Sequence, residues 1–242
     1  MADQPGREVA HDPDSRFWKW SDRVGVRDSR FEERDAPAPD PSHVAMRVNL
    51  DACIQCTRCL RACREEQVND VIGYAFRGEH SKIVFDQDDP MGASTCVACG
   101  ECVQACPTGA LMPARGAGLQ PVDTKVDSVC PFCGVGCQLT YHVESKKNVI
   151  HFVTGRDGPS NHGRLCVKGR YGFDYAHHPQ RLTKPLIRKP GAKKDPHHAV
   201  KPEDWASVFR EASWEEALEF AAAGLRRIRD QDRFAQIGRA HV

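Results

Sequence analysis

The sequence predicts an α+β fold in which short strands and short helices surround clustered cysteines. Cysteine is unusually frequent, with 12 among 242 residues, and two runs of these cysteines share one spacing. A strand–turn–strand pattern from Leu139 to Val153 follows a further group of cysteines. An amphipathic helix is expected from Ser213, because Ser213 and Glu216 form a capping box. Small cysteine-rich units should therefore precede a helical segment.

The two matching runs indicate a pair of [4Fe–4S] clusters. The second run has the spacing Cys-x2-Cys-x2-Cys-x3-Cys-Pro, which is typical of cubane cluster ligands, and the first run repeats it with Arg64 in place of proline. In paired runs of this kind the fourth cysteine ligates the cluster of the other run. The expected ligand sets are Cys53, Cys56, Cys59 and Cys106 for one cluster, and Cys96, Cys99, Cys102 and Cys63 for the other.

Structural zinc and disulfide bonds are the alternatives for these cysteines. Structural zinc favours two cysteine pairs that lie well apart in the sequence, whereas each run here packs its cysteines into one short segment. Disulfides are typical of small secreted proteins, and Met1–Pro5 lacks the basic and apolar regions of a signal peptide. Both alternatives therefore fit less well than iron–sulfur clusters.

A third group of cysteines predicts a third cluster. Its members are Cys130, Cys133, Cys137 and the distant Cys166. Gly134 and Gly136 would allow backbone N–H groups to approach the sulfur atoms and tune the cluster. A tetrahedral zinc ion would also suit this spacing. The cluster is favoured because the 12 cysteines divide into sets of four with none left over.

Short elements are expected around these runs. They are a strand at Met46–Leu50, a helix over 57–67, strands at Val71–Phe76 and Lys82–Asp86 around a turn at Gly78, and a linker at Gly116–Gly118. Residues 1–43 are rich in Asp, Arg and Pro and are expected to form a mostly extended tail with one aromatic anchor among Phe17, Trp18 and Trp20. A subunit-docking arm is the alternative for this tail.

Composition excludes several classes of function. Hydrophobic residues make up 40%, charged residues 28%, and the net charge is +1. This balance lacks the basic stripe of a nucleic-acid-binding protein. No apolar run approaches the length of a membrane span. The chain is expected to be cytoplasmic, because thiolates that hold metal survive in a reducing compartment.

Residues 44–235 resemble the alpha subunit of NAD-dependent, molybdenum-containing formate dehydrogenases. The motifs that carry this resemblance are Ala52–Cys59, Ser94–Gly100, Cys130–Cys137 and Arg164–Arg170. The resemblance implies that the third cluster lies beside a molybdenum bis-pterin-guanine-dinucleotide cofactor, with Lys168 between cluster and pterin as an electron relay. It also implies a flavin- and NAD-binding partner subunit, with formate oxidised to carbon dioxide in the full protein.

The resemblance also implies a division into domains. The expected order is a tail (1–43), a two-cluster ferredoxin-like domain (44–120), a small β-rich [4Fe–4S] domain (121–182) and the start of an α/β molybdopterin oxidoreductase domain (183–235). The family's catalytic residues lie beyond position 242, so the chain as written is expected to be inactive alone. Residues 236–242 are expected to be read-through into a sequencing adapter.

Two other functions stay open. Similar cysteine runs occur in cluster-bearing subunits of NADH dehydrogenases and hydrogenases. A stand-alone ferredoxin-like electron carrier is the other alternative, although the helix from Ser213 then has no sheet of its own to cover. A downstream catalytic cysteine or selenocysteine with its histidine would favour formate chemistry.

Overall fold

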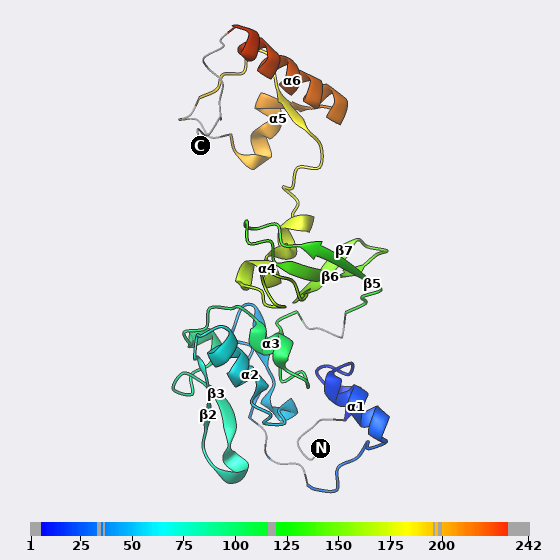
Figure 1. Cartoon of the computed structure of the whole chain (residues 1–242), viewed down its shortest axis with the longest axis vertical. Coiled ribbons are helices and arrows are strands. Elements are labelled where there is room, and N and C mark those ends of the chain that lie inside the picture. Colours follow the sequence, from blue (N-terminus) through cyan, green and yellow to red (C-terminus); the bar gives the residue numbers. More distant parts are fainter. Residues whose placement is uncertain are drawn as a thin grey trace. The chain divides into compact units, whose positions relative to one another are not determined.

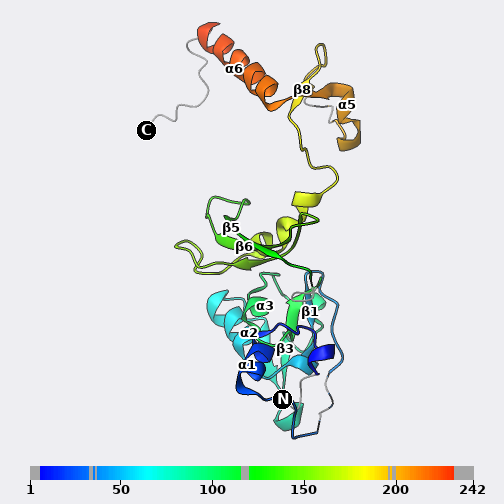
Figure 2. The same cartoon turned by 90° about the vertical axis from the view of Figure 1, so that its right-hand side faces the viewer.

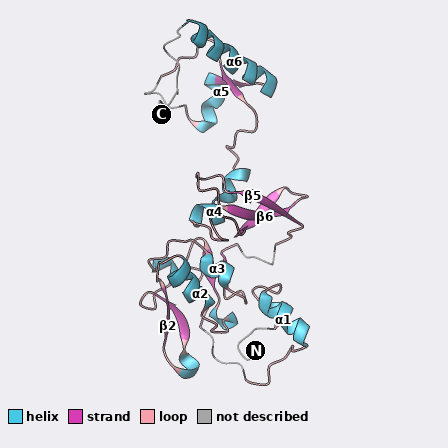
Figure 3. Ribbon diagram, viewed as in Figure 1, coloured by secondary structure: helices cyan, strands magenta, loops and turns pink. Residues whose placement is uncertain are grey.

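The computed structural model describes residues 6–32, 35, 37–115, 120–195, 197 and 200–231. Two compact units divide at Tyr175: one covers residues 1–175 and the other residues 176–242 (Figure 1). The expected linker glycines Gly116–Gly118 and the expected read-through segment 236–242 lie outside the described residues. Short strands and helices alternate through the described chain, which is consistent with the predicted α+β class (Figure 3).

The first unit begins with a helix that corrects the prediction for the N-terminal segment. Helix α1 (Arg16–Val24) starts at Ser15, whose side chain accepts a hydrogen bond from the Trp18 N–H, and ends at Gly25 with a left-handed φ of 70°. Trp18 is buried, and the Phe17 N–H donates to the Pro107 carbonyl at 2.9 Å. The aromatic anchor was predicted correctly, but an extended conformation is wrong for residues 16–24, because the cap and the buried indole stabilise a helix.

Two small antiparallel sheets and two short helices form the part of the first unit that carries the first two cysteine runs. Strand β1 (Met46–Val48) pairs with β4 (Leu111–Pro113), and β2 (Ile72–Ala75) pairs with β3 (Lys82–Phe85). Helix α2 (Arg58–Arg61) follows the first run and α3 (Glu101–Ala105) lies within the second, and the two helices contact each other (Figure 1). The predicted helix over 57–67 and hairpin over 71–86 are thus confirmed. The predicted strand at 46–50 is shorter than expected and ends at Val48, because a helical turn begins at Leu50.

The residue after the fourth cysteine of each run explains why the two helical segments end at different points. Pro107 follows Cys106, and α3 ends at Ala105 because proline disfavours a helical conformation in the residue before it. Arg64 follows Cys63 in the first run, and the chain continues there as the π-turn η3 (Ala62–Glu66). The helical segment of the first run therefore continues through η3 to Glu66, whereas that of the second run ends before its fourth cysteine.

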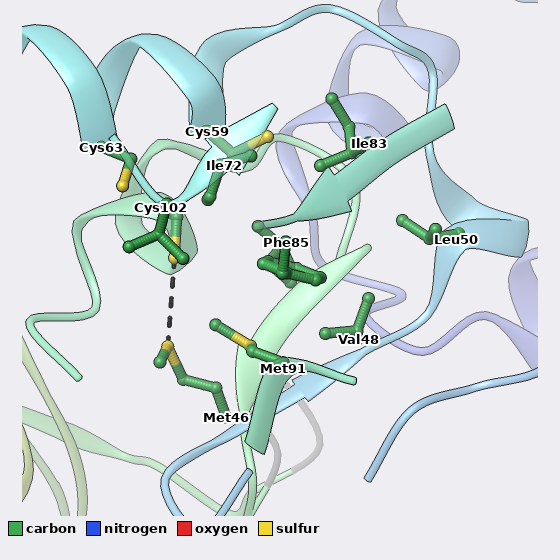
Figure 4. Packing of buried hydrophobic residues seen from close by; sticks show 12 residues of the cluster. Met46, Val48, Leu50, Cys59, Cys63, Ile72, Ile83, Phe85, Met91 and Cys102 are labelled. Carbon is green, nitrogen blue, oxygen red and sulfur yellow. Dashed lines mark hydrogen bonds between the residues drawn. The ribbon is translucent and has the colours of Figure 1, made fainter. Parts of the chain in front are cut away.

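The core of this part consists of apolar side chains packed directly against cysteines. Its buried members are listed together: Met46, Val48, Leu50, Cys59, Cys63, Val71, Ile72, Ile83, Phe85, Met91, Cys102 and Leu111. Figure 4 shows Cys63 and Cys102 beside Ile72, and the Cys102 Sγ lies 3.9 Å from the Met46 Sδ. Burial against hydrocarbon thus extends to the positions that the sequence assigns to metal.

A three-stranded sheet follows in the same unit. Its strands β5 (Thr124–Val129), β6 (Gln138–Glu144) and β7 (Val149–Gly155) are all antiparallel (Figure 2). The hairpin of β6 and β7 was predicted, whereas β5 was not, because most of its residues are exposed and show no simple alternation. Helix α4 (Val167–Tyr171) packs against β7 and begins directly after Cys166.

The second unit is a small hairpin with two helices. Strand β8 (Leu186–Arg188) pairs with β9 (Phe209–Glu211), and α5 (Trp205–Val208) immediately precedes β9. Helix α6 (Trp214–Gln231) begins as the capping box predicts, since the Glu216 N–H donates to the Ser213 Oγ at 3.2 Å. Trp214, Leu218 and Leu225 are all more than 60% exposed on this helix.

Remaining short helical turns complete the described elements. They are η1 (Arg7–Val9), η2 (Leu50–Ala52), η4 (Gly78–His80), η5 (Met91–Ala93), η6 (Gly172–His177) and η7 (Pro202–Asp204). No helix among the described residues is long and apolar enough to cross a membrane.

Candidate iron–sulfur sites

The first candidate site brings together cysteines from both runs. One small cavity is lined by Cys53, Cys56, Cys59 and Cys106, together with Leu50, Ile83 and Pro107. Three of these cysteines come from the loop before α2 and from α2 itself, while Cys106 arrives from the end of α3. The structure therefore groups these side chains in the set that the exchange of fourth ligands predicts.

The second candidate site has the reciprocal composition. Its cavity is lined by Cys63, Cys96, Cys99 and Cys102, together with Val71, Phe85, Met91 and Gly100. Cys63 reaches it from the π-turn at the end of α2. The two runs thus exchange their last cysteines in space, although ligation itself stays a prediction.

Both cysteine loops use the same backbone conformation. The second residue after the first cysteine of each run has a left-handed φ, 54° at Gln55 and 57° at Ala98, and its N–H donates to the sulfur of Cys53 or Cys96 at 3.4 Å. Two residues further on, Thr57 and Gly100 also have positive φ values, 59° and 75°. These loops turn backbone donors toward sulfur, which stabilises negative charge on a thiolate.

Burial makes the thiol form favourable where no metal is bound. Desolvation, aided by the neighbouring Cys106 and Cys53 sulfurs, raises the pKa of Cys59 to about 12. Burial likewise raises the pKa of Cys102 well above its usual range, and Cys99, Cys59, Cys96 and Cys63 add to the effect. Iron binding would release these protons and compensate the buried charge, because only thiolates ligate.

The third set gathers on the three-stranded sheet and the start of α4. Cys130 is buried, Cys137 is half-buried, and Cys133 and Cys166 are exposed. The Cys130 N–H donates to the Cys137 carbonyl at 2.8 Å. Burial first, and then the charges of Cys130, Cys133 and Cys166, raise the pKa of Cys137.

Exposed apolar residues lie next to the cysteines of the third set in the sequence. Phe132, Val135 and Val167 are 37%, 56% and 40% exposed. Lys168 follows Val167 on α4 and its side chain is also exposed. The structure thus places Lys168 two residues after Cys166 at the protein surface, and its role as an electron relay stays a prediction.

The first two sets have the four-cysteine composition of a cubane cluster site. Among the described residues, no group of three or more His, Cys, Asp or Glu side chains could hold one metal ion. A cubane cluster places each of its cysteine thiolates on a different iron, so its ligands can stand farther apart than those of one ion. Four cysteines line each of the first two cavities and provide the donor chemistry that such a cluster requires. A cluster and not a zinc ion at the third set stays a prediction.

A buried ion pair joins the second and third sets, and the sequence did not reveal it. Arg170 on α4 and Glu101 on α3 form this pair, with side chains that are 4% and 8% exposed. The Arg170 Nε also donates to the Cys99 carbonyl at 2.8 Å, and its Nη1 donates to the Gln104 Oε1 at 2.8 Å. We call Arg170, Glu101 and Gln104 the Arg170 clamp.

Backbone groups complete the clamp. The Leu165 N–H donates to the Glu101 Oε1 at 3.0 Å, and the Gln104 side chain accepts from the Gly155 N–H and donates to the Gly163 carbonyl, both at 2.9 Å. The paired residues are separated by 69 positions. The sequence spacing of Arg170 and Glu101 therefore gives no sign that they pair. Arg170 itself was part of the Arg164–Arg170 motif.

Family comparisons agree with the division into cysteine-rich parts. Residues 52–110 match the 4Fe-4S dicluster domain, and residues 123–178 match the molybdopterin oxidoreductase Fe4S4 domain. All 12 cysteines lie within these two matched ranges. Both matched ranges fall inside the predicted domains 44–120 and 121–182, whose boundaries stay predictions.

Whole-sequence comparison finds relatives among formate dehydrogenase-like proteins. A Staphylococcus haemolyticus protein named "Putative formate dehydrogenase" is 27% identical over 250 residues, covering 87% of this chain and 24% of the relative. A Staphylococcus aureus protein of the same name is 26% identical with the same coverage. The chain thus spans about a quarter of the length of the curated relatives it matches.

One solved structure has a limited resemblance. It is an NAD+-reducing [NiFe]-hydrogenase in the H2-reduced state, 21% identical, with a TM-score of 0.45 over 50% of this chain and 53% of the hydrogenase chain. This similarity is too low to establish a shared fold.

Proposed function

We propose that this chain is the electron-transfer part of a formate dehydrogenase-like molybdopterin oxidoreductase. The observation that carries the proposal is the grouping of the 12 cysteines into sets of four, two of which line cavities built from both runs. When bound, [4Fe–4S] clusters accept and release single electrons at potentials that the protein adjusts. A protein of this kind would relay electrons between a catalytic centre and a partner.

The chain's own residues would hold and tune these centres. Cys59, Cys63 and Cys102 supply sulfur from within the apolar core, where water is excluded. The Gln55 and Ala98 N–H groups donate to ligand sulfurs and so favour the more negative, reduced state. Burial has the opposite effect, because added negative charge is poorly solvated in a low-dielectric core.

Lys168 is the residue that we assign to the catalytic side of the relay. Its exposed ammonium stands beside the ligand Cys166, where a positive charge attracts an extra electron on the neighbouring centre. A molybdenum bis-pterin-guanine-dinucleotide cofactor would be bound mainly by parts of the protein beyond this chain, with the third set facing it. The exposed apolar residues Phe132, Val135 and Val167 are consistent with a further domain covering this surface.

The partners and location follow from the same proposal. Formate would be the substrate of the whole protein, and a flavin- and NAD-binding subunit would receive electrons from the first two sets. Free thiols in all 12 positions suit a reducing cytoplasm.

Formate-dependent reduction of the whole protein tests this function. The longer reading frame would be expressed anaerobically, and formate would be added while electron paramagnetic resonance follows the clusters. We expect signals of reduced [4Fe–4S] clusters after formate addition. Reduction by NADH or hydrogen but not by formate would instead support the NADH dehydrogenase or hydrogenase alternative, and the absence of any downstream catalytic domain would support the stand-alone carrier.

A further inference from the structure

Helix α4 extends from the third cysteine set to the second. At its centre, a Cβ added to Gly169 would lie 3.5 Å from the Cys130 Sγ, so the helix backbone passes directly against the third set. At its end, Tyr171 packs against the core that contains Cys63 and Cys102. The five residues of α4 therefore connect two candidate cluster sites within one short helix.

The Arg170 clamp holds the end of this helix in place. Its guanidinium binds Glu101, Gln104 and the Cys99 carbonyl, all belonging to the second run or to α3. Gly100 permits this approach, because a Cβ there would overlap the Arg170 Cδ and lie 2.6 Å from the Tyr171 hydroxyl. The hydroxyl of Tyr171 is therefore fixed against the residue that follows Cys99.

This hydroxyl has no acceptor among the described residues. Its oxygen is buried and makes no hydrogen bond there, unlike the Tyr74 hydroxyl, which donates to the Gln55 Oε1 at 2.7 Å. A buried hydroxyl without a partner costs about 1–3 kcal/mol. Native proteins rarely leave such a group unpaired, so a missing bound group is a natural explanation.

The position of the hydroxyl identifies the kind of acceptor. Gly100, whose added Cβ would lie 2.6 Å from the Tyr171 hydroxyl, lines the second cavity together with Cys63, Cys96, Cys99 and Cys102. The neighbouring Arg170 guanidinium carries only N–H donors, so it cannot accept a hydrogen bond from this hydroxyl. Sulfur is therefore the acceptor that the second cavity offers to this hydroxyl.

We propose that the Tyr171 hydroxyl donates a hydrogen bond to a sulfur of the cluster held by Cys63, Cys96, Cys99 and Cys102. This inference rests on the proposed function, since it requires that set to bind a cluster. A donor to sulfur stabilises the reduced state and raises the reduction potential. Tyr171 would thereby make the second cluster a better acceptor for electrons arriving from the third set.

The test compares Tyr171→Phe with the parent chain of 242 residues after anaerobic reconstitution. Iron content is measured first, and the midpoint potential of each cluster is then obtained by a redox titration followed by electron paramagnetic resonance. The signal of the second set is identified by its loss in Cys63→Ser. We expect unchanged iron and a more negative potential for that signal, with its reduction equilibrium weakened about tenfold, which is about 59 mV.

Tyr74→Phe is the matched control, because it removes a hydroxyl that already has a protein acceptor. It should leave the potential of the second set unchanged. An unchanged or more positive potential in Tyr171→Phe would overturn the inference while leaving the proposed function intact. A parent chain that binds no iron would overturn both.

A second variant covers the case in which Tyr171→Phe fails to assemble its clusters. Site-specific 3-fluorotyrosine at position 171 keeps the ring and the hydroxyl but makes the phenol a more acidic, stronger donor. The potential of the second set should then move to more positive values. An unchanged or more negative value would overturn the inference.

Discussion

At the scale of single residues, the two cysteine runs depend on backbone positions that most residues avoid. Gln55, Thr57 and Ala98 hold positive φ values although they carry a Cβ. Such conformations are uncommon for non-glycine residues and tend to occur where the surrounding structure imposes them. Here they turn the N–H groups of Gln55 and Ala98 toward sulfur, so the strained positions coincide with the proposed metal sites.

Replacing Cys63 tests the exchange of ligands. Cys63→Ser should remove the cluster of Cys96, Cys99 and Cys102 and leave the cluster of Cys53, Cys56, Cys59 and Cys106, because Cys63 lines only the second cavity. Iron content should fall by about a third, as expected for losing one of three [4Fe–4S] clusters. Arg64→Ala, which alters the exposed neighbour, is the control. Loss of the first cluster in place of the second would contradict the exchange.

Lys168 provides a second residue-scale prediction. In the whole enzyme, Lys168→Ala should slow formate-dependent cluster reduction, because the ammonium attracts an extra electron on the neighbouring cluster. Iron content should stay intact, because the Lys168 side chain is exposed. Stopped-flow absorbance would follow the reduction. Lys168→Arg keeps the charge and should retain most of the rate. Unchanged turnover in the alanine variant would count against the relay.

His142 predicts a pH dependence of stability. Burial, with a further effect of Lys125, lowers the pKa of His142 to about 4, and its ring stacks on Phe152 at 4.0 Å. An unfolded histidine has a pKa of about 6.5 and binds a proton earlier as the pH falls. The unfolding free energy should therefore decrease as the pH falls from about 6.5 towards 4.

A comparison of variants isolates this contribution. His142→Gln should show a smaller loss of unfolding free energy across that pH window than the parent chain, as measured by denaturant titration at each pH. His80→Gln changes a histidine that is 81% exposed and should keep the parent slope. Identical slopes in the parent and His142→Gln would refute the assignment.

At the scale of elements, a buried ion pair connects α3 and α4. The Arg170–Glu101 pair is buried, and Arg170 also binds the Cys99 carbonyl next to a proposed ligand. A buried ion pair adds little net stability compared with an apolar pair, but removing one partner leaves an uncompensated charge. The pair therefore acts chiefly to fix where α4 meets the second set.

Arg170→Met should destabilise the protein by about 3–5 kcal/mol, because Glu101 is left buried without its partner. The unfolding free energy from denaturant titration would measure this loss. Arg115→Met removes an arginine from the exposed pair with Asp174 and should cost at most about 1 kcal/mol. Adding Glu101→Leu to Arg170→Met should restore part of the stability. Equal losses in Arg170→Met and Arg115→Met would contradict a specific role for the buried pair.

Several elements that depend on residues close in the sequence were predictable, whereas contacts between distant residues were not. The cap at Ser213 and the β6–β7 hairpin depend on residues close in sequence, and both were predicted correctly. Helix α1 was missed although Ser15 and Gly25 cap it locally, because the Asp-, Arg- and Pro-rich composition of residues 1–43 predicted a mostly extended tail. The clamp was also missed, since Arg170 and Glu101 meet only after folding.

At the scale of the whole molecule, the 12 cysteines divide into three predicted sets of four. Spacing predicted the first two sets and the count of cysteines the third, and the structure brings Cys106 to the first run and Cys63 to the second. The chain spans 24% of the length of the relatives that it matches. The proposed contribution of the chain is to hold centres that pass electrons.

Metal analysis of the anaerobically reconstituted chain tests this claim most directly. Iron, acid-labile sulfide and zinc would be measured per chain, with Mössbauer spectroscopy to identify the cluster type. The account predicts about twelve irons and about twelve sulfides with no zinc, as three cubane clusters require. One zinc in place of four irons at the third set, or iron without sulfide, would contradict it.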